Sequence, residues 1–112
     1  MITVGDVVLT RFPLTNGYEM KVRPAVVVAM EGPANEDGLI LVAAITGSAT
    51  RWNDPGIVPI SDLRGTGLDR PSAIQVRRLF STQASKVGNT IGRVGPHSIE
   101  SARRQLAEYL GV

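Results

Sequence analysis

One arginine and one threonine stand at corresponding places in this sequence. Arg23 comes shortly before the apolar run 25–30, and Thr46 follows the apolar run 39–45. A guanidinium group can hold a phosphodiester through two hydrogen bonds and stabilise the added negative charge of a five-coordinate transition state. A threonine hydroxyl can bond the reacting phosphate or orient an attacking 2′-hydroxyl group. The pair could therefore serve phosphate chemistry, if the fold brings the two side chains together.

The two apolar runs have the length and composition of β-strands, and residues 31–38 between them are turn-forming. An antiparallel hairpin is predicted. A turn centred on positions 34 and 35 pairs Met30 with Leu39, Val28 with Leu41, and Arg23 with Thr46. Paired residues point to the same face, so the last pair would meet at the open end. A slip of one residue would separate them. The alternative, that both residues simply end core strands in water, stays open.

The remaining elements must support this hairpin. Further strands are predicted at 7–12, 57–60, 72–80 and 90–94, with Pro59 favouring an edge position. In the third of these strands, apolar Ile74 and Val76 alternate with Gln75 and Arg77, a pattern typical of one solvent-facing side. Both faces of the hairpin are apolar, so each needs a cover.

A helix is predicted to begin at Gly95-Pro96. Its apolar residues recur at helical spacing and would cover one side of the sheet; they are Ile99, Ala102, Leu106 and Leu110. Short strands, turns rich in Gly and Pro, and one closing helix predict a mainly β fold. We expect a small, partly open antiparallel β-barrel with a C-terminal helix.

Length and composition limit the function. The chain has 112 residues, of which 43% are apolar, so residues 1–112 are expected to form a single domain with a proper core. There is no cysteine and only one histidine, His97, which excludes Cys nucleophiles and Cys-His metal clusters. His97 is expected to be a solvated residue at the helix start. No glycine motif resembles a phosphate loop, and no cofactor is implied. Without a signal peptide or membrane-spanning segment, a soluble cytoplasmic protein is expected.

Basic residues are distributed unevenly. Ten of the twelve are arginines, and residues 70–99 carry five basic side chains with no Asp or Glu. This segment is a candidate phosphate-facing surface. Equally, its side chains could pair with acids from elsewhere in the fold.

Several short motifs together resemble the MazF/PemK family of toxin endoribonucleases, in order and spacing over nearly the whole chain. They are Gly5-Asp6-Val7-Val8, Val22-Arg23-Pro24-Ala25-Val26-Val27-Val28, Leu41-Val42-Ala43-Ala44-Ile45-Thr46, Gly67-Leu68 before Ser72-Ala73-Ile74, and Ile91-Gly92. The resemblance implies an SH3-like barrel of the CcdB/MazF type and a homodimer. It also implies metal-independent cleavage of single-stranded RNA by 2′-hydroxyl attack, and a cognate antitoxin whose flexible, acidic segment occupies the RNA groove.

By this resemblance the catalytic residues of the family fall on Arg23 and Thr46. Because arginine stays protonated in proteins, Arg23 is expected to stabilise the transition state, while Thr46 positions the phosphate or the nucleophile. Gln75 and Arg77 depart from the family pattern, so the acid and base roles of one branch cannot be transferred. Arg77 could bind phosphate or adapt the surface to another partner, or form a solvated strand face.

Gln75, Arg77 and several other residues are candidate RNA contacts. Lys21 is a plausible phosphate contact or a surface lysine, and Arg51 with Trp52 could stack on an unpaired base or be partly buried. The loop residues Asn16, Gly17, Tyr18 and Glu19 could read base edges, although Asn16-Gly17 could do no more than turn the chain. Two rival functions remain: a CcdB-like toxin that inhibits a protein such as DNA gyrase, and a non-catalytic nucleic-acid-binding barrel.

Overall fold

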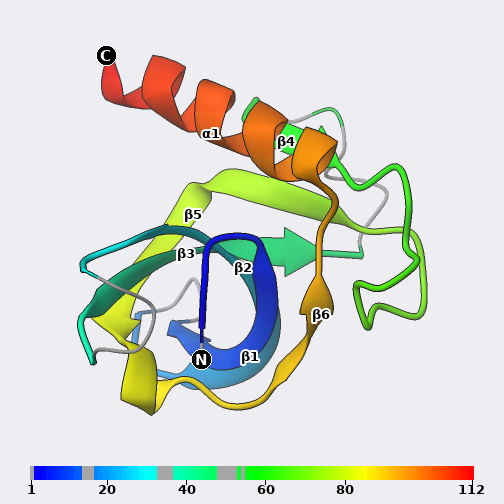
Figure 1. The fold of residues 1–112 in the computed structure, drawn as a ribbon. Coiled ribbons are helices and arrows are strands. Elements are labelled where there is room, and N and C mark those ends of the chain that lie inside the picture. The colour runs from blue at the N-terminus through cyan, green and yellow to red at the C-terminus, as the bar shows by residue number, and fades with distance from the viewer. Residues whose placement is uncertain (1, 14–16, 33–36, 48–52, 54) are drawn as a thin grey trace.

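The computed structural model of the chain describes residues 2–13, 17–32, 37–47, 53 and 55–112. Within them, an antiparallel sheet has the strand order β4-β5-β3-β2-β1-β6. The elements are β1 (Asp6–Pro13), β2 (Met20–Met30), β3 (Leu39–Thr46), β4 (Ile57–Pro59), β5 (Ala73–Gln83), the short 3-10 helix η2 (Ala84–Lys86), β6 (Thr90–Arg93) and α1 (Pro96–Leu110). The sheet curls into a half-barrel, and α1 lies across one side of it, next to β4 and β5 (Figure 1). The predicted fold class is confirmed.

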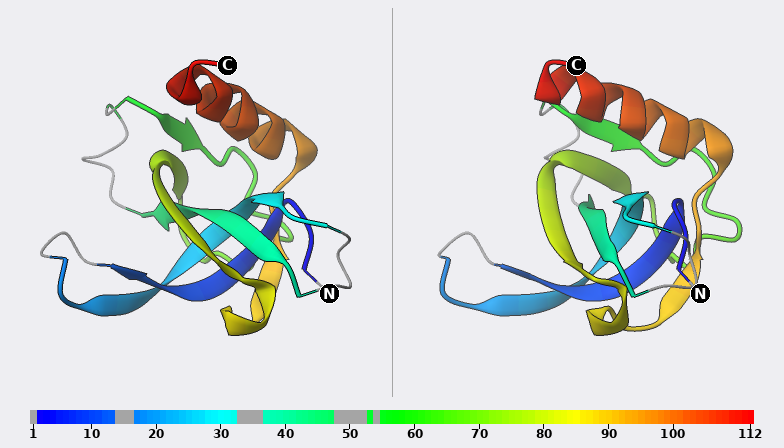
Figure 2. Two further views of the ribbon diagram at one scale, coloured as in Figure 1. Left: turned by 90° about the vertical axis from the view of Figure 1, so that its left-hand side faces the viewer. Right: turned by 60° about the vertical axis from the view of Figure 1, so that its left-hand side comes forward.

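Two buried clusters lie on opposite faces of the sheet. One contains Val26, Val28 and Ile74 and is covered by Ala102 and Leu106 of α1. The other contains Val8, Val27 and Val42 and is closed by Phe12, whose ring lies 5.7 Å from that of Phe80. The expectation that each face of the hairpin needs a cover is therefore confirmed, since α1 covers one side and the curl of the sheet encloses the other (Figure 2).

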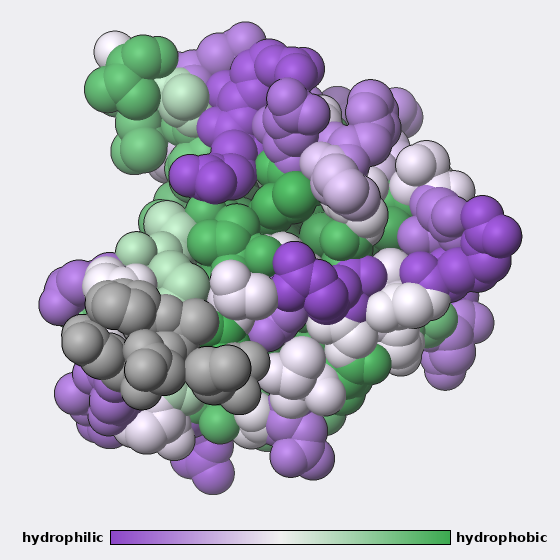
Figure 3. Space-filling view, viewed as in Figure 1, coloured by the Kyte–Doolittle hydropathy of each residue, from purple (hydrophilic) through white to green (hydrophobic). Residues whose placement is uncertain are grey.

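The closing helix begins as its sequence predicts, but it differs from the prediction at one position in its packing. Gly95 is the N-cap, Pro96 is the first helical residue, and Gly111 ends the helix in the left-handed conformation at φ 79°. Leu110, however, is 60% exposed instead of packing on the sheet. The last turn of α1 extends past the sheet (Figure 1), so the apolar stripe loses its support there. Figure 3 shows hydrophobic residues exposed at this end of the helix.

The register of the central hairpin follows the prediction at one end and departs from it at the other. Ala25 lies opposite Ala44 and Val27 opposite Val42, as expected. A β-bulge between Val27 and Ala29 then shifts the pairing, so Met30 faces Ile40. The predicted pairs Met30–Leu39 and Val28–Leu41 are therefore wrong. The bulge lies towards the turn, so it leaves the open end in the predicted register.

One strand prediction was wrong in part. Residues 72–80 were expected to have a solvent-facing side, but Gln75 is buried at 8% exposure. Its backbone lies opposite Ala44 of β3 and Ile57 of β4, so neighbouring strands flank this part of β5 on both edges. Arg77, two residues further on, is exposed as predicted. Among the described residues, no helix is long and apolar enough to cross a membrane.

Candidate functional site

Arg23 and Thr46 line the same pocket, which has a volume of about 260 Å³ and is called the Arg23 pocket below. It forms where the start of β2 and the end of β3 meet the loop before β5. Ala25 pairs with Ala44, and Arg23 and Thr46 each lie two residues further along their strands, so side-chain alternation places them on one face of the sheet. The described lining residues are Lys21, Val22, Arg23, Pro24, Ile45, Thr46, Gly47, Leu68, Asp69, Arg70 and Ser72.

Arg23 is half-buried in this pocket. Its Nε atom is buried and has no hydrogen-bond partner among the residues that the structure describes. A buried N–H donor without a partner is unfavourable, and buried polar groups are almost always satisfied. The guanidinium is therefore arranged to receive an acceptor from outside the described chain, and an anion is the acceptor that it binds most strongly.

Thr46 is buried at 8% exposure at the last position of β3. On its other side it lies opposite Ala73, the first residue of β5, so two strands fix its backbone. Thr46 also has an interaction partner within the protein. A hydroxyl on a backbone held by two strands, in the same pocket as a guanidinium, is suited to hold one phosphate oxygen or one ribose hydroxyl.

The pocket has a surplus of positive charge. Its described lining has three cationic side chains, Lys21, Arg23 and Arg70, against the single carboxylate of Asp69. The ion pairs found within the described residues join Arg64 to Asp62 and Arg93 to Asp6, and neither involves the pocket. Unpaired cations that converge on one concave site attract anions.

The basic segment 70–99 does not act as one surface. Only Arg70 reaches the Arg23 pocket. Arg77 lies over the Tyr109 ring at 5.3 Å, and a terminal nitrogen of Arg78 donates to the Pro13 carbonyl at 3.2 Å. Arg93 pairs with Asp6, as the alternative of pairing with an acid predicts. Sequence reasoning thus included Arg70 in the segment but did not single it out, and it missed Asp69 and Ser72.

The other predicted RNA contacts are placed as follows. Lys21 lines the Arg23 pocket. Gln75 lies opposite Ala44 and so shares the face of Thr46, but it does not line the pocket. Gly17, Tyr18 and Glu19 lie exposed just before β2, whose first residues project from the body of the molecule (Figure 2). Asn16, Arg51 and Trp52 lie outside the described residues.

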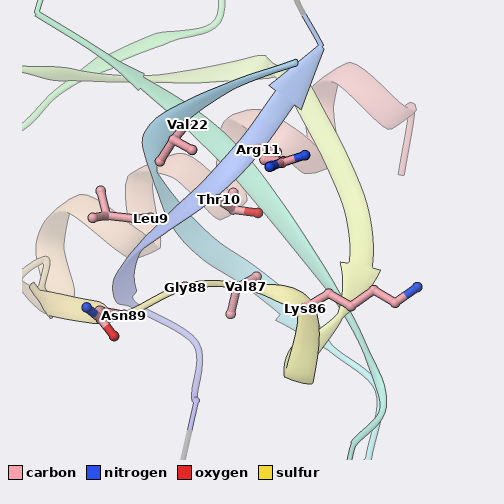
Figure 4. A pocket seen from close by; sticks show the side chains of 8 residues that line it. All are labelled: Leu9, Thr10, Arg11, Val22, Lys86, Val87, Gly88 and Asn89. Atoms are coloured by element: carbon pink, nitrogen blue, oxygen red, sulfur yellow. The ribbon is translucent and has the colours of Figure 1, made fainter. Parts of the chain in front are cut away.

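A second pocket, of about 400 Å³, lies between β1 and the segment after η2 (Figure 4). It is lined by Leu9, Thr10, Arg11, Val22, Lys86, Val87, Gly88 and Asn89. Of these, only Val22 also lines the Arg23 pocket. Its described lining carries two cationic side chains, Arg11 and Lys86, and no carboxylate. Figure 4 shows the Lys86 side chain extending away from Leu9 and Val22.

His97 is exposed in the first turn of α1, as expected for a solvated helix-start residue. Among the residues that the structure describes, no three side chains of His, Asp or Glu converge as a metal site would require.

Comparison with models of protein families gives one match. A family model described as a PemK-like, MazF-like toxin of type II toxin-antitoxin systems matches residues 3–110. Comparison with curated protein sequences gives no significant match.

Solved structures are similar over the full length. An endoribonuclease in complex with its cognate antitoxin, from a mycobacterial species, has a TM-score of 0.75 and 19% identity, covering 100% of this chain and 97% of that chain. MazF from Deinococcus radiodurans has a TM-score of 0.74 and 20% identity, covering 99% and 97%. The MazE-MazF structure from the same organism has a TM-score of 0.71 and 21% identity, covering 99% and 96%. These similarities establish the fold.

Proposed function

Since the chain belongs to the PemK-like, MazF-like toxin family of type II toxin-antitoxin systems, we propose that it is an endoribonuclease that cleaves single-stranded RNA in the Arg23 pocket. The observation that carries this proposal is the meeting of Arg23 and Thr46 in one cationic pocket. Family membership alone does not require this pair, because a toxin that blocks a protein target needs neither residue.

The proposed reaction is an internal transesterification. The ribose 2′-oxygen attacks the adjacent phosphorus, its proton leaves to solvent, and the bond from phosphorus to the 5′-oxygen breaks. The 5′-oxygen takes up a proton, so the products are a 2′,3′-cyclic phosphate and a 5′-hydroxyl end. Negative charge accumulates on the two non-bridging oxygens during the attack.

In this proposal Arg23 stabilises this charge. Its Nε, which has no partner among the described residues, supplies one donor and its terminal nitrogens supply others, so the fork can bind a phosphate through two hydrogen bonds. Thr46 orients the scissile phosphate or the 2′-hydroxyl from the adjacent strand. The positive charge of the guanidinium takes the role that a metal ion has in other nucleases, and we propose that cleavage is metal-independent. No acid or base is assigned to Gln75, which is buried, or to Arg77, which lies at Tyr109.

The proposal extends to partners. One similar structure is an endoribonuclease in complex with its cognate antitoxin, and another is a MazE-MazF structure. We propose that this chain also has an antitoxin, with an acidic segment that neutralises Lys21, Arg23 and Arg70 in the pocket. As the family resemblance implies, the active form would be a homodimer, acting on RNA in the cytoplasm.

The test uses purified protein and a long single-stranded RNA in the presence of EDTA. The wild type should cleave it and leave cyclic-phosphate ends. Arg23→Ala and Thr46→Ala should each lower the single-turnover rate about 10²- to 10³-fold, the usual cost of losing a transition-state hydrogen-bond donor. Arg103→Ala removes an exposed arginine of α1 and should cleave normally.

Other outcomes would overturn the proposal. Cleavage that survives both substitutions would refute the catalytic pair, and 5′-phosphate ends would refute the mechanism. Tight RNA binding without any cleavage would identify a non-catalytic nucleic-acid-binding barrel. If the protein neither binds nor cleaves RNA, a CcdB-like action on a protein target becomes the better explanation.

A further inference from the structure

Arg70 lies beside the catalytic pair on a different element. It belongs to the loop before β5 and lines the Arg23 pocket together with Asp69 and Ser72. Its side chain passes directly over Gly47, the residue after Thr46. A Cβ atom built on Gly47 would come within 2.9 Å of the Arg70 Nε and 3.4 Å of its Cδ. A glycine at this position therefore leaves the space that the Arg70 side chain occupies.

The loop that carries Arg70 is firmly anchored. Thr66 is fully buried, and its hydroxyl donates to the Leu63 carbonyl at 2.6 Å and accepts from the Leu68 amide at 3.2 Å. Gly67 and Gly92 fit the loop closely against β6. A Cβ on Gly67 would lie 2.3 Å from the Ile91 carbonyl oxygen, and one on Gly92 would lie 2.3 Å from the Thr66 carbonyl carbon.

The anchoring continues to Arg70 itself. The Gly65 carbonyl accepts from the Arg93 amide at 2.8 Å, and the Ser72 hydroxyl donates to the Arg70 carbonyl at 2.9 Å. A long cationic side chain is thus held on a fixed backbone at the rim of the pocket. No ion pair neutralises it within the part of the chain that the structure describes.

We propose that Arg70 is a substrate-binding residue that holds the RNA phosphate next to the scissile one. The proposal rests on the ribonuclease function proposed above. Arg23 and Arg70 approach Thr46 from two elements, and one guanidinium can hold one phosphodiester through two bonds. Two adjacent phosphates held in this way would fix the direction of the RNA strand across the pocket and align its 2′-hydroxyl for attack.

The test measures binding of a short, fluorescein-labelled 2′-O-methyl RNA of random sequence, which cannot be cleaved because its 2′-oxygens are blocked. Arg70→Ala should raise the dissociation constant about tenfold, as expected for loss of one charged phosphate contact. It should also make the plot of log affinity against log salt concentration shallower by about 0.7, the value for one phosphate contact on a single strand. Arg70→Lys should keep the salt slope, because it keeps the charge.

Arg103→Ala is the matched control, since it removes one exposed positive charge outside the pocket. It should leave both the dissociation constant and the salt slope at the wild-type values. Gly47→Ala is the geometric variant. Its methyl group displaces the Arg70 side chain, so it should weaken binding in the wild-type background and have no further effect in the Arg70→Ala background.

The outcomes separate the two proposals. If the affinity of Arg70→Ala for the probe depends on salt concentration as steeply as that of Arg103→Ala, the inference about Arg70 is overturned, even if cleavage depends on Arg23 and Thr46. If Gly47→Ala weakens binding equally with and without Arg70, the inference is overturned as well. If the wild type shows the predicted Arg70 dependence but does not cleave RNA, the inference about phosphate binding holds and the proposed catalysis fails. If the wild type does not bind the probe at all, both are wrong.

Discussion

Arg23 joins two properties that are rarely found together at a purely structural position. It is a charged side chain in a half-buried place, and its buried Nε has no partner among the described residues. Lysine at this position would keep the charge but lose the planar fork and the Nε donor. The chemistry proposed for this pocket depends on that fork.

Arg23→Lys should therefore retain RNA binding but lower the single-turnover cleavage rate about 10- to 100-fold, since charge alone replaces only part of a bidentate contact. The rate is measured with enzyme in excess over a labelled RNA, and binding is measured separately on the 2′-O-methyl probe. Arg103→Lys serves as the control on exposed surface and should be fully active. Full activity of Arg23→Lys would show that a point charge is sufficient and would refute the bidentate role.

At the scale of single residues, the sequence predicted the meeting of Arg23 and Thr46, because the open end of the hairpin follows the expected register. It singled out Arg77 as a candidate phosphate contact and did not distinguish Arg70 from Arg78 and Arg93. These residues are alike in type, and their different roles depend on tertiary neighbours: Gly47 beside Arg70, Tyr109 beneath Arg77 and Asp6 opposite Arg93. Periodicity carries no information about such contacts.

At the scale of elements, strand and helix positions could be predicted because hydrophobic patterns and turn residues are local signals. The bulge between Val27 and Ala29 could not, since an extra residue in one strand is decided by how the sheet curls as a whole. Periodicity predicted that Leu110 packs on the sheet, because it identifies the apolar side of a helix but not the point where contact with the sheet ends. Leu110 is in fact exposed. The elements that position the site could thus be predicted, whereas the irregular pairing within the hairpin and the packing at the end of the helix could not.

One contact between elements should respond to pH. The Asp37 carboxylate, just before β3, accepts hydrogen bonds from the Ser85 backbone amide at 2.9 Å and from the Ser85 hydroxyl at 2.8 Å in η2. The backbone bond first, and then the hydroxyl bond, lower the pKa of Asp37 below its ordinary value of 3.8. The contact therefore links the end of the hairpin to the segment after β5.

The pKa of Asp37 is lower in the folded protein than in the unfolded chain. The contact therefore stabilises the fold fully at pH values above the ordinary pKa of 3.8, and this stabilisation is lost as the pH falls through the lower pKa of the folded protein. Asp37→Ala should be less stable than the wild type at pH 7, and the difference should disappear in acid. Urea unfolding of both proteins across this pH range measures the difference in their free energy of unfolding. The Ser85 amide resonance should titrate with the same midpoint; a midpoint at or above 3.8 would contradict the contact.

At the scale of the whole molecule, the N-terminal segment and the last strand are joined at one buried carboxylate. Asp6 is 4% exposed; one of its oxygens accepts from Arg93, and the other accepts from the Thr3 amide at 3.0 Å. Arg93 also donates to the Val4 carbonyl at 3.1 Å. These bonds close β6 onto β1, and β6 in turn anchors the loop that carries Arg70.

Asp6→Ala should consequently lower the free energy of unfolding by about 1–3 kcal/mol, because it leaves the Thr3 amide and the Arg93 guanidinium without their acceptor. Urea denaturation at pH 7 measures the loss. Arg64→Ala removes an ion pair whose side chains are 92% and 56% exposed, so it should leave stability nearly unchanged. If the pocket loop depends on β6 as described, Asp6→Ala should also weaken RNA binding at temperatures below its unfolding transition, whereas Arg64→Ala should not. Equal stability of the two variants would show that the buried carboxylate does not hold the two ends of the sheet together.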